Sequence, residues 1–190
     1  LSANQNFPIA QFNLGVIYFE GKRIKQNIQK AIHYFTLSAN RNYSNAQFYL
    51  GLIYYEGKYV DRNIEKSLHY FSLSANQNHQ HAQFFLGLIY DEGKYANKNI
   101  NKAIYYYSLS AEQNNPKALF NLGLIYSLGE GIEKDIEKAI RYFSLSANLN
   151  CVEAQFTLGM IYYEGKIVSR DIKQSIHYLS LAAKQNHHRS

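Results

Sequence analysis

The chain has 190 residues, 46% of them hydrophobic, and a formal net charge of +6. Its apolar runs fall short of the roughly 18 residues of a membrane-spanning helix, so the composition excludes an integral membrane segment. Cys151 is the only cysteine, which rules out an internal disulfide, disfavours a disulfide-stapled secreted protein and favours a cytoplasmic location.

One twelve-residue stretch dominates the sequence, because it recurs five times at a fixed step of 36 residues. Its copies begin at Ala10, Ala46, Ala82, Ala118 and Ala154. A unit this short cannot bury its apolar face alone, so neighbouring units must stack into an extended array. The sequence therefore predicts that function resides on a surface rather than in a pocket.

The first half of each repeat predicts a helix, over residues 10–20 in the first copy. The spacing of Ala10, Leu14, Ile17 and Tyr18 is that of an apolar stripe on an amphipathic helix. A glycine then follows at the place where a left-handed residue would end the helix. This predicted stop recurs at Gly21, Gly57, Gly93, Gly129 and Gly165.

The second half of each repeat predicts another helix, which begins at residue 28 in the first copy. A side-chain oxygen just before it can cap the first turn, in Asn27, Asn63, Asn99, Asp135 and Asp171. We expect each second helix to end near an asparagine, because asparagine tolerates the left-handed conformation. These residues are Asn42, Asn78, Asn114, Asn150 and Asn186.

A glycine also lies inside each first helix, where it costs about 1 kcal/mol relative to alanine. These residues are Gly15, Gly51, Gly87, Gly123 and Gly159. We expect close approach of the paired helix to offset the cost. The small residues expected to face the glycines are Ala31, Ser67, Ala103, Ala139 and Ser175.

At these positions the chain resembles the Sel-one-like repeats, which are relatives of tetratricopeptide repeats. The fourth copy carries the family pattern most fully, in Ala118, Leu122, Gly123, Tyr126, Gly129, Gly131, Asp135, Lys138, Ala139 and Ala147. The other copies replace the second family glycine with Arg23, Tyr59, Tyr95 and Ile167. The loop between the helices is therefore expected to follow a different path in those copies.

The resemblance implies an all-α fold, an α-solenoid of five 36-residue helix-turn-helix repeats stacked in a right-handed superhelix. It covers residues 1–190 as a single repeat array. We assign residues 1–6 to the end of a preceding repeat, 187–190 to a tail, and the repeats to 7–42, 43–78, 79–114, 115–150 and 151–186. We expect a fragment of a longer protein, whose uncapped end repeats predict concentration-dependent end-to-end self-association.

Charge is divided unevenly within the repeat. The first-helix segments contain no basic residue and have a net charge of −5. Because the overall net charge is +6, the second helices and loops together have a net charge of +11. The resemblance implies that first helices line a concave face, which would then be acidic and would disfavour nucleic acid. The basic outer layer is either a solvated face or a weak contact for RNA or anionic lipid.

Two variable columns of the first helices are the predicted binding positions, and we expect them to point away from the core. The first column is Asn13, Tyr49, Phe85, Asn121 and Thr157; the second is Phe19, Tyr55, Asp91, Ser127 and Tyr163. A near-constant column, Phe12, Phe48, Phe84, Phe120 and Phe156, would extend the same track. These aromatic residues either anchor a partner or pack on the next repeat.

A glutamate occupies the last turn of four first helices, where the macrodipole disfavours negative charge by about 0.3–1 kcal/mol. These residues are Glu20, Glu56, Glu92 and Glu164. Either the lysine two residues later pairs with each of them, or the carboxylates receive lysine or arginine from a bound segment.

No motif for catalysis, cofactor binding or metal binding is recognisable, so no residue is predicted for these roles and we do not expect an enzyme. His33, His69 and His177 share one column of the second helix, about 10 Å apart between neighbours, which is too far for a single metal ion.

We therefore predict a protein-interaction scaffold or adaptor that holds a basic or aromatic partner segment along the concave first-helix face. One alternative is nucleic-acid or anionic-surface binding through the basic outer layer, although nucleic acid is an unlikely partner for this charge distribution. The other alternative is a regulatory repeat region of a larger enzyme, such as a kinase, which the family resemblance implies.

Overall fold

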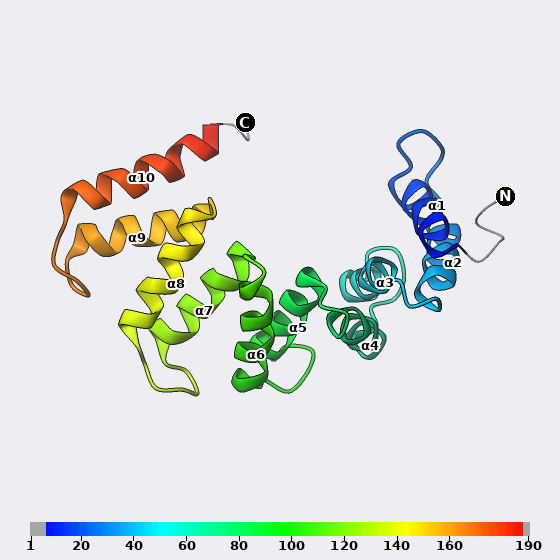
Figure 1. Ribbon diagram of the computed structural model, residues 1–190, viewed down its shortest axis with the longest axis horizontal. Coiled ribbons are helices and arrows are strands. Elements are labelled where there is room, and N and C mark those ends of the chain that lie inside the picture. Colours follow the sequence, from blue (N-terminus) through cyan, green and yellow to red (C-terminus); the bar gives the residue numbers. More distant parts are fainter. Residues whose placement is uncertain (1–6, 188–190) are drawn as a thin grey trace. The chain divides into compact units, whose positions relative to one another are not determined.

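The computed structural model describes residues 7–187, and within that range the chain forms ten α-helices in five consecutive pairs (Figure 1). The helices are α1 (Pro8–Glu20), α2 (Ile28–Ala39), α3 (Ser44–Glu56), α4 (Ile64–Ala75), α5 (Gln80–Glu92), α6 (Ile100–Glu112), α7 (Pro116–Leu128), α8 (Ile136–Asn148), α9 (Val152–Glu164) and α10 (Ile172–His187). The predicted all-α repeat fold is confirmed. The assignments for residues 1–6 and 188–190 lie outside the described residues.

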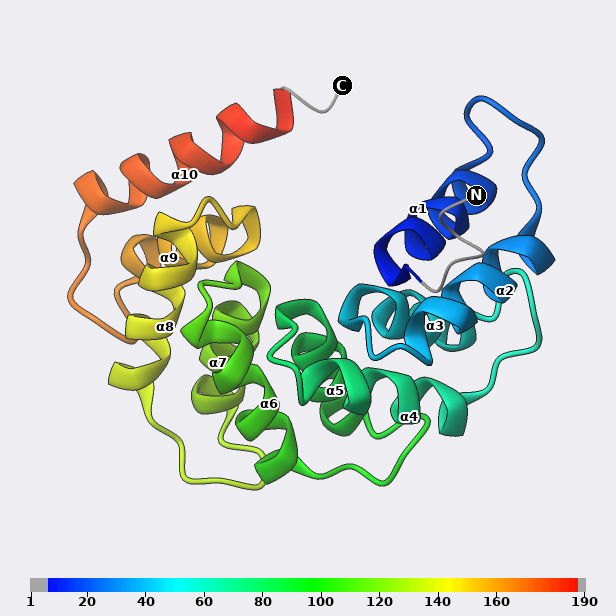
Figure 2. The same ribbon diagram turned by 45° about the vertical axis from the view of Figure 1, so that its right-hand side comes forward.

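Two compact units make up the chain, residues 1–98 and residues 99–190. In the first unit α1 packs on α2, α3 on α4, and each pair contacts the next helix along the chain. In the second unit α6 contacts α7, and α7 through α10 follow one another in contact, as Figure 2 shows. The predicted right-handed superhelix concerns the stacking of all five repeats and stays a prediction.

Both predicted helix-end signals are present in the structure. Each second helix begins after a side chain that accepts a backbone N–H three residues later, as Asn27 Oδ1 does from Lys30 at 2.9 Å. Asn63, Asn99, Asp135 and Asp171 make the same bond. Each first helix ends at a left-handed glycine, such as Gly57 with φ of 64°. The capped, short loops fold each repeat into a helical hairpin.

Left-handed asparagines connect the repeats. Asn42, Asn78, Asn114 and Asn150 have φ between 60° and 62°, as predicted for the turn after a second helix. The last copy differs, because α10 continues through Asn186 to His187. The predicted helix end near Asn186 agrees with this, because α10 as described ends one residue later.

The glycines inside the first helices make room for rings. A Cβ on Gly15 or Gly51 would lie 2.5 Å from the ring of Phe35 or Phe71, respectively. Close packing is therefore confirmed, but the ring of the second helix, rather than only its small residues, occupies the space. The small residue contributes as predicted at Ser67, whose hydroxyl donates to the Gly51 carbonyl at 2.9 Å.

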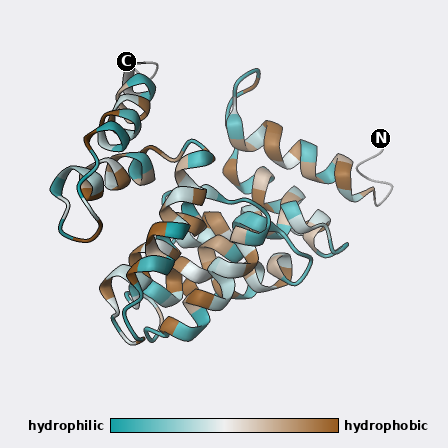
Figure 3. Cartoon of the chain, turned by 60° about the vertical axis from the view of Figure 1, so that its left-hand side comes forward, coloured by the Kyte–Doolittle hydropathy of each residue, from teal (hydrophilic) through white to brown (hydrophobic). Residues whose placement is uncertain are grey.

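The core of each unit contains a cluster of small, branched and aromatic residues from the second helix of one pair and the first helix of the next. In the first unit it contains Ala31, Phe35, Ala46, Leu50 and Ile53, all at most 2% exposed. In the second unit Ala139, Phe143, Ala154 and Leu158 play the same part. Figure 3 shows hydrophobic and hydrophilic segments alternating along the helices. Among the described residues, no helix is both long and apolar enough to cross a membrane.

Candidate protein-binding surface

The predicted binding residues all lie on the first helices of the pairs, in three columns that recur every 36 residues. The structure separates these columns by burial. The glutamate column is exposed, whereas the two variable columns are largely half-buried. The three columns therefore differ in what they can offer a partner.

The first variable column lies at the junction between repeats. The ring of Tyr49 in α3 packs on Phe12 and Phe35 of the preceding repeat, with centroids 5.4 and 5.2 Å apart. Phe85 in α5 stacks on Phe71 in the same way, at 5.2 Å and an interplanar angle of 16°. The prediction that Tyr49 and Phe85 point away from the core is wrong, because their rings fill the space between adjacent helix pairs.

The polar residues of this column differ in whether they make contacts within the fold. Asn121 donates from Nδ2 to the hydroxyl of Tyr107 at 2.9 Å, and Tyr107 is a buried ring of the preceding repeat. Thr157 is half-buried, and Asn13 is exposed. Of these five positions, Asn13 is the one whose side chain is available to a partner in the way that the sequence predicted.

The second variable column contacts the loop of the following repeat. Phe19 packs on Tyr59 at 5.7 Å, and Tyr55 packs on Tyr95 at 6.2 Å, each edge to face. Tyr55 also contacts Phe85 at 5.6 Å. Phe19 and Tyr55 therefore do not point away from the core as predicted. The loop tyrosines that replace the second family glycine thus give Phe19 and Tyr55 an aromatic partner.

The remaining members of the second column differ from one another. Asp91 is half-buried, and Ser127 turns its hydroxyl back to the carbonyl of Leu124 at 2.8 Å. Tyr163 is 52% exposed, with the guanidinium carbon of Arg170 5.4 Å from its ring centroid. A binding role at these positions stays a prediction, and Tyr163 has the most accessible side chain among them.

Two of the four glutamates pair with a local lysine. Glu20 Oε2 lies 3.1 Å from Lys22 Nζ, and Glu164 Oε2 lies 3.2 Å from Lys166 Nζ. Both pairs are exposed, so each contributes little to stability. At these two repeats the local lysine offsets the unfavourable position of the carboxylate in the last helical turn.

The other two glutamates lack this pair. Among the described residues Glu56 and Glu92 form no ion pair, because Lys58 and Lys94 instead lie about 5 Å above the tyrosine ring that follows each in sequence. Burial and then the Glu92 carboxylate raise the pKa of Tyr55, so Glu92 acts on the preceding repeat. Glu56 and Glu92 are thus exposed carboxylates on adjacent helices, available to an external cation.

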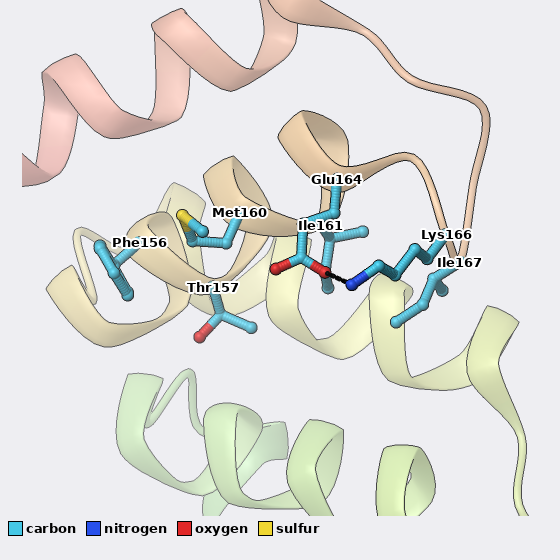
Figure 4. A pocket seen from close by; sticks show the side chains of 7 residues that line it. All are labelled: Phe156, Thr157, Met160, Ile161, Glu164, Lys166 and Ile167. Atoms are coloured by element: carbon cyan, nitrogen blue, oxygen red, sulfur yellow. Dashed lines mark ion pairs between the residues drawn. The ribbon is translucent and has the colours of Figure 1, made fainter.

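The α9 surface carries a group of exposed apolar side chains (Figure 4). Phe156 and Ile167 are 55% and 50% exposed, beside a depression of about 220 Å³. At the equivalent place in the first repeat, Phe12 is covered by Tyr43 and Tyr49 of the next repeat. The residues around the α9 depression are Phe156, Thr157, Met160, Ile161, Glu164, Lys166 and Ile167.

His79 is the histidine most involved in the fold. Its Nδ1 accepts the Ala82 N–H at 3.2 Å and its Nε2 faces Asn45 Oδ1 at 3.0 Å, which fixes the neutral ring with its proton on Nε2. The ring also stacks on Phe48 at 4.8 Å. Burial, and then the charge of His81, lower the pKa of His79 to about 4.

The histidines of the second helices and Cys151 make contacts within the fold. His33, His69 and His177 are exposed on second helices, each edge-on to the next tyrosine in sequence. Within residues 7–187, His, Cys, Asp and Glu side chains do not gather in groups of three that could hold a metal ion. Burial raises the pKa of the Cys151 thiol, which donates to Glu153 at 3.2 Å.

Sequence reasoning missed a column of buried glutamines. Gln47 is 1% exposed and donates to Asn42 Oδ1 at 3.1 Å, while its own Oε1 accepts from Gln77 at 2.6 Å. Gln155 and Gln185 form the equivalent pair at 2.9 Å. The signal was visible, because glutamine recurs in four of the five copies beside the first-helix alanine.

The comparisons with known proteins agree with this architecture. The model of the Sel1 repeat family matches residues 8–43, 44–79, 80–115, 116–151 and 152–187. The crystal structure of c5321, a protective antigen of uropathogenic Escherichia coli with an SLR fold, superposes with a TM-score of 0.91 at 31% identity. That match covers 96% of this chain and 39% of c5321, so the chain spans well under half of its relative.

A Sel1 repeat protein from Oxalobacter formigenes is similar at 30% identity with a TM-score of 0.89, over 95% of this chain and 74% of its own. Helicobacter pylori cysteine-rich protein B is 28% identical, with a TM-score of 0.53, over 70% of this chain and 96% of its own. No curated protein sequence matches the chain. With the five family matches covering nearly every described residue, the chain belongs to the Sel1 repeat family.

Proposed function

We propose that this chain is a non-enzymatic protein-interaction scaffold that holds a segment of a partner along its first-helix surface. Sel1 repeat proteins generally mediate protein–protein interaction. The observation that carries the proposal is the contrast between buried and exposed columns. The alanine that begins each first-helix segment recurs in all five copies and is buried from the second copy on, whereas Glu56 and Glu92 recur at an exposed position and form no ion pair among the described residues.

The partner segment we propose is basic. Glu56 and Glu92 are exposed, lie on first helices of adjacent repeats, and have no ion pair among the described residues. A lysine or arginine of the partner would pair with them at the rim of the contact, which favours association rate and specificity more than affinity. Asn13 and Tyr163 add exposed polar and aromatic contacts on the same set of helices.

Capture from native lysate of the source organism tests this proposal. The Glu56→Gln/Glu92→Gln variant removes two charges and keeps side-chain shape, so the fold should be unchanged. We expect selective loss of captured proteins relative to the parent chain. The matched control is Glu65→Gln/Glu112→Gln, on second helices, which should retain them. Equal capture by all three chains would refute the first-helix surface as the binding site.

The alternatives receive less support. A nucleic-acid groove would need a positive track, and the first helices carry the exposed glutamates instead. A regulatory region of a larger enzyme and a cytoplasmic location stay predictions. End-to-end self-association also stays a prediction, favoured by the exposed Phe156 and Ile167, and a sedimentation series that shows a monomer at every concentration would refute it.

A further inference from the structure

The loop between α7 and α8 differs from its four counterparts in charge. Residues 129–138 contain Glu130, Glu133, Asp135 and Glu137 against two lysines, a net charge of −2. The equivalent segments 21–30, 57–66, 93–102 and 165–174 each carry net positive charge. The second unit therefore has an acidic loop at a position that is otherwise basic.

The backbone of this loop is also different. Gly131 has φ of 79°, whereas its tyrosine counterparts Tyr59 and Tyr95 are not among the residues with positive φ. A Cβ on Gly131 would lie 3.1 Å from Ile100 Cγ2, so the bare glycine lets the loop lie against the start of α6. A tyrosine at this position would be strained, because L side chains rarely adopt a φ of 79°.

A cleft of about 710 Å³ opens beside this loop, within the second unit. Its volume falls in the range of about 300–1,000 Å³ typical of binding pockets. Ile104, Ile132 and Ile136 supply half-buried aliphatic surface, and Tyr126 closes one side. The complete lining is Asn101, Ile104, Tyr126, Ile132, Glu133, Lys134, Asp135, Ile136 and Glu137.

The carboxylates at the cleft differ in whether they already have a partner within the chain. Asp135 is committed to the fold, because its Oδ1 caps α8 by accepting the Lys138 N–H at 2.9 Å. Glu133 and Glu137 are exposed and form no ion pair among the described residues. Of the nearby cations, Lys138 is bonded to the Tyr126 hydroxyl at 2.9 Å, and Lys134 lies in the lining itself.

The corresponding depression in the first unit is smaller, about 370 Å³, and is lined by Tyr54, Asn63, Glu65, Lys66, His69 and Tyr70. Val60, the counterpart of Ile132, packs against the core cluster together with Ile32, the counterpart of Ile104. The neighbouring loop tyrosine, Tyr59, packs on Phe19 at 5.7 Å. The first unit therefore offers a matched control surface, which has carboxylates at the same repeat positions, Asp61 and Glu65, but a loop of net positive charge and a tyrosine in place of Gly131.

We propose that the cleft between α6 and the α7–α8 loop binds a short cationic segment of a partner protein. An aliphatic side chain of that segment would lie against Ile104 and Ile132, and flanking lysines or arginines would pair with Glu133 and Glu137. The negative rim repels phosphate, which excludes nucleic acid as the occupant. The proposal rests on the scaffold function, but it concerns a surface that the Glu56/Glu92 test does not touch.

Fluorescence anisotropy with defined peptides tests the cleft directly. The probe is a labelled peptide of alternating lysine and leucine, and its glutamate–leucine counterpart is the comparison. We expect saturable binding of the lysine peptide alone. Glu133→Gln/Glu137→Gln should raise its dissociation constant about three- to tenfold at low salt, as loss of two exposed ion pairs implies. Asp61→Asn/Glu65→Gln, the same positions in the second repeat, should leave it unchanged.

A second variant fills the cleft without changing charge. Asn101→Trp, at an exposed position of α6, should weaken the lysine peptide by at least about tenfold, whereas Gln29→Trp at the matching position of α2 should not. Far-ultraviolet circular dichroism confirms that each variant is folded. Equal binding of the glutamate peptide, equal losses in the paired controls, or no saturation up to about 1 mM peptide would each overturn the proposal.

Discussion

The junctions between repeats are aromatic in residues 1–98 and smaller or polar in residues 99–190. In the first unit Tyr49 and Phe85 insert rings between helix pairs, beside Phe19 and Tyr55. In the second unit the same columns hold Thr157 and Ser127, and the ring of Tyr107 is met by a hydrogen bond from Asn121. The same repeat fold therefore accommodates both aromatic contacts and polar hydrogen bonds between adjacent repeats.

This difference shows that variation between repeats has two sources. The paired glutamines vary together, because Leu119 and Leu149 replace both members of the pair in the fourth copy. Asn121 likewise lies beside Tyr107, whose counterparts Phe35 and Phe71 have no hydroxyl to receive its hydrogen bond. Such positions vary as complementary partners inside the fold. Glu56 and Glu92, by contrast, are exposed, and only positions of this kind can determine which partner binds.

The largest loss of stability is expected when a side chain fills the space beside the glycine inside a first helix. In Gly51→Leu the new side chain would overlap the Phe71 ring, since even a Cβ would lie 2.5 Å from it. We expect a loss of about 3 kcal/mol or more in unfolding free energy, measured by urea denaturation. Asn13→Leu, at an exposed position of α1, should cost less than about 0.5 kcal/mol. Equal midpoints for the two variants would contradict the packing described.

The second largest loss of stability is expected when an aromatic residue at a junction is replaced by its counterpart from the second unit. Tyr49→Thr removes the ring contacts with Phe12 and Phe35, and we expect a loss of about 2 kcal/mol, less than for a fully buried ring. Tyr105→Thr is the control, because Tyr105 is 58% exposed, and it should change stability by about 0.5 kcal/mol at most. If Tyr49→Thr were equally neutral, the column would be free for binding after all.

The His79 junction should make the first unit sensitive to acid. The folded pKa of His79, about 4, lies below the ordinary value of 6.5, so the unfolded chain binds more protons between these values. Its contribution to stability is therefore complete above about pH 6.5 and is lost as pH falls towards 4. Melting temperatures measured from pH 7.5 to 4 should fall more for the parent chain than for His79→Asn.

The His79→Asn variant is a suitable comparison because an asparagine caps the first helix at the equivalent position of the next repeat. Asn115 Oδ1 caps α7 by accepting the N–H of Ala118, the counterpart of Ala82, at 3.3 Å, and it does not titrate. His33→Asn, at an exposed site, should leave the pH dependence of the parent chain intact. Identical pH profiles for His79→Asn and the parent chain would show that His79 does not couple protonation to folding.

The smallest effect is expected at the polar junction of the second unit. Asn121→Ala removes the hydrogen bond to Tyr107 and should cost about 1 kcal/mol. In a double-mutant cycle with Tyr107→Phe, most of that cost should disappear once the hydroxyl is absent. Additive losses in the cycle would show that the hydrogen bond does not stabilise the junction.

Most of the fold followed from local signals in the sequence. The Asn27-type caps and Gly57-type stops act within one turn of their own helix, so they could be located from the sequence. The partner of Gly51 was predicted only in part, because the Phe71 ring reaches it from the second helix. Which of two adjacent helical positions faces the neighbouring repeat depends on the stacking of pairs, and for that reason Tyr49 was placed on the wrong side.

The candidate site was less predictable for the same physical reason. Exposed Glu56 and half-buried Tyr55 are adjacent in sequence, and periodicity assigned both to one surface. The different pairing of Glu20 and Glu56 also depends on the next loop, because a tyrosine after Lys58 attracts the lysine above its ring. The cleft beside Gly131 requires both a loop conformation and the neighbouring α6, neither of which the repeat pattern specifies.

Site-specific photocross-linking shows whether the first-helix surface binds a partner protein. A benzoylphenylalanine introduced at Glu56, on α3, is compared in native lysate with one at His69, which is also exposed, on α4. We expect a discrete protein adduct from position 56 that is absent from position 69 and is competed by excess unlabelled chain. Adducts from position 69 alone, or the same adducts from both positions, would contradict this expectation.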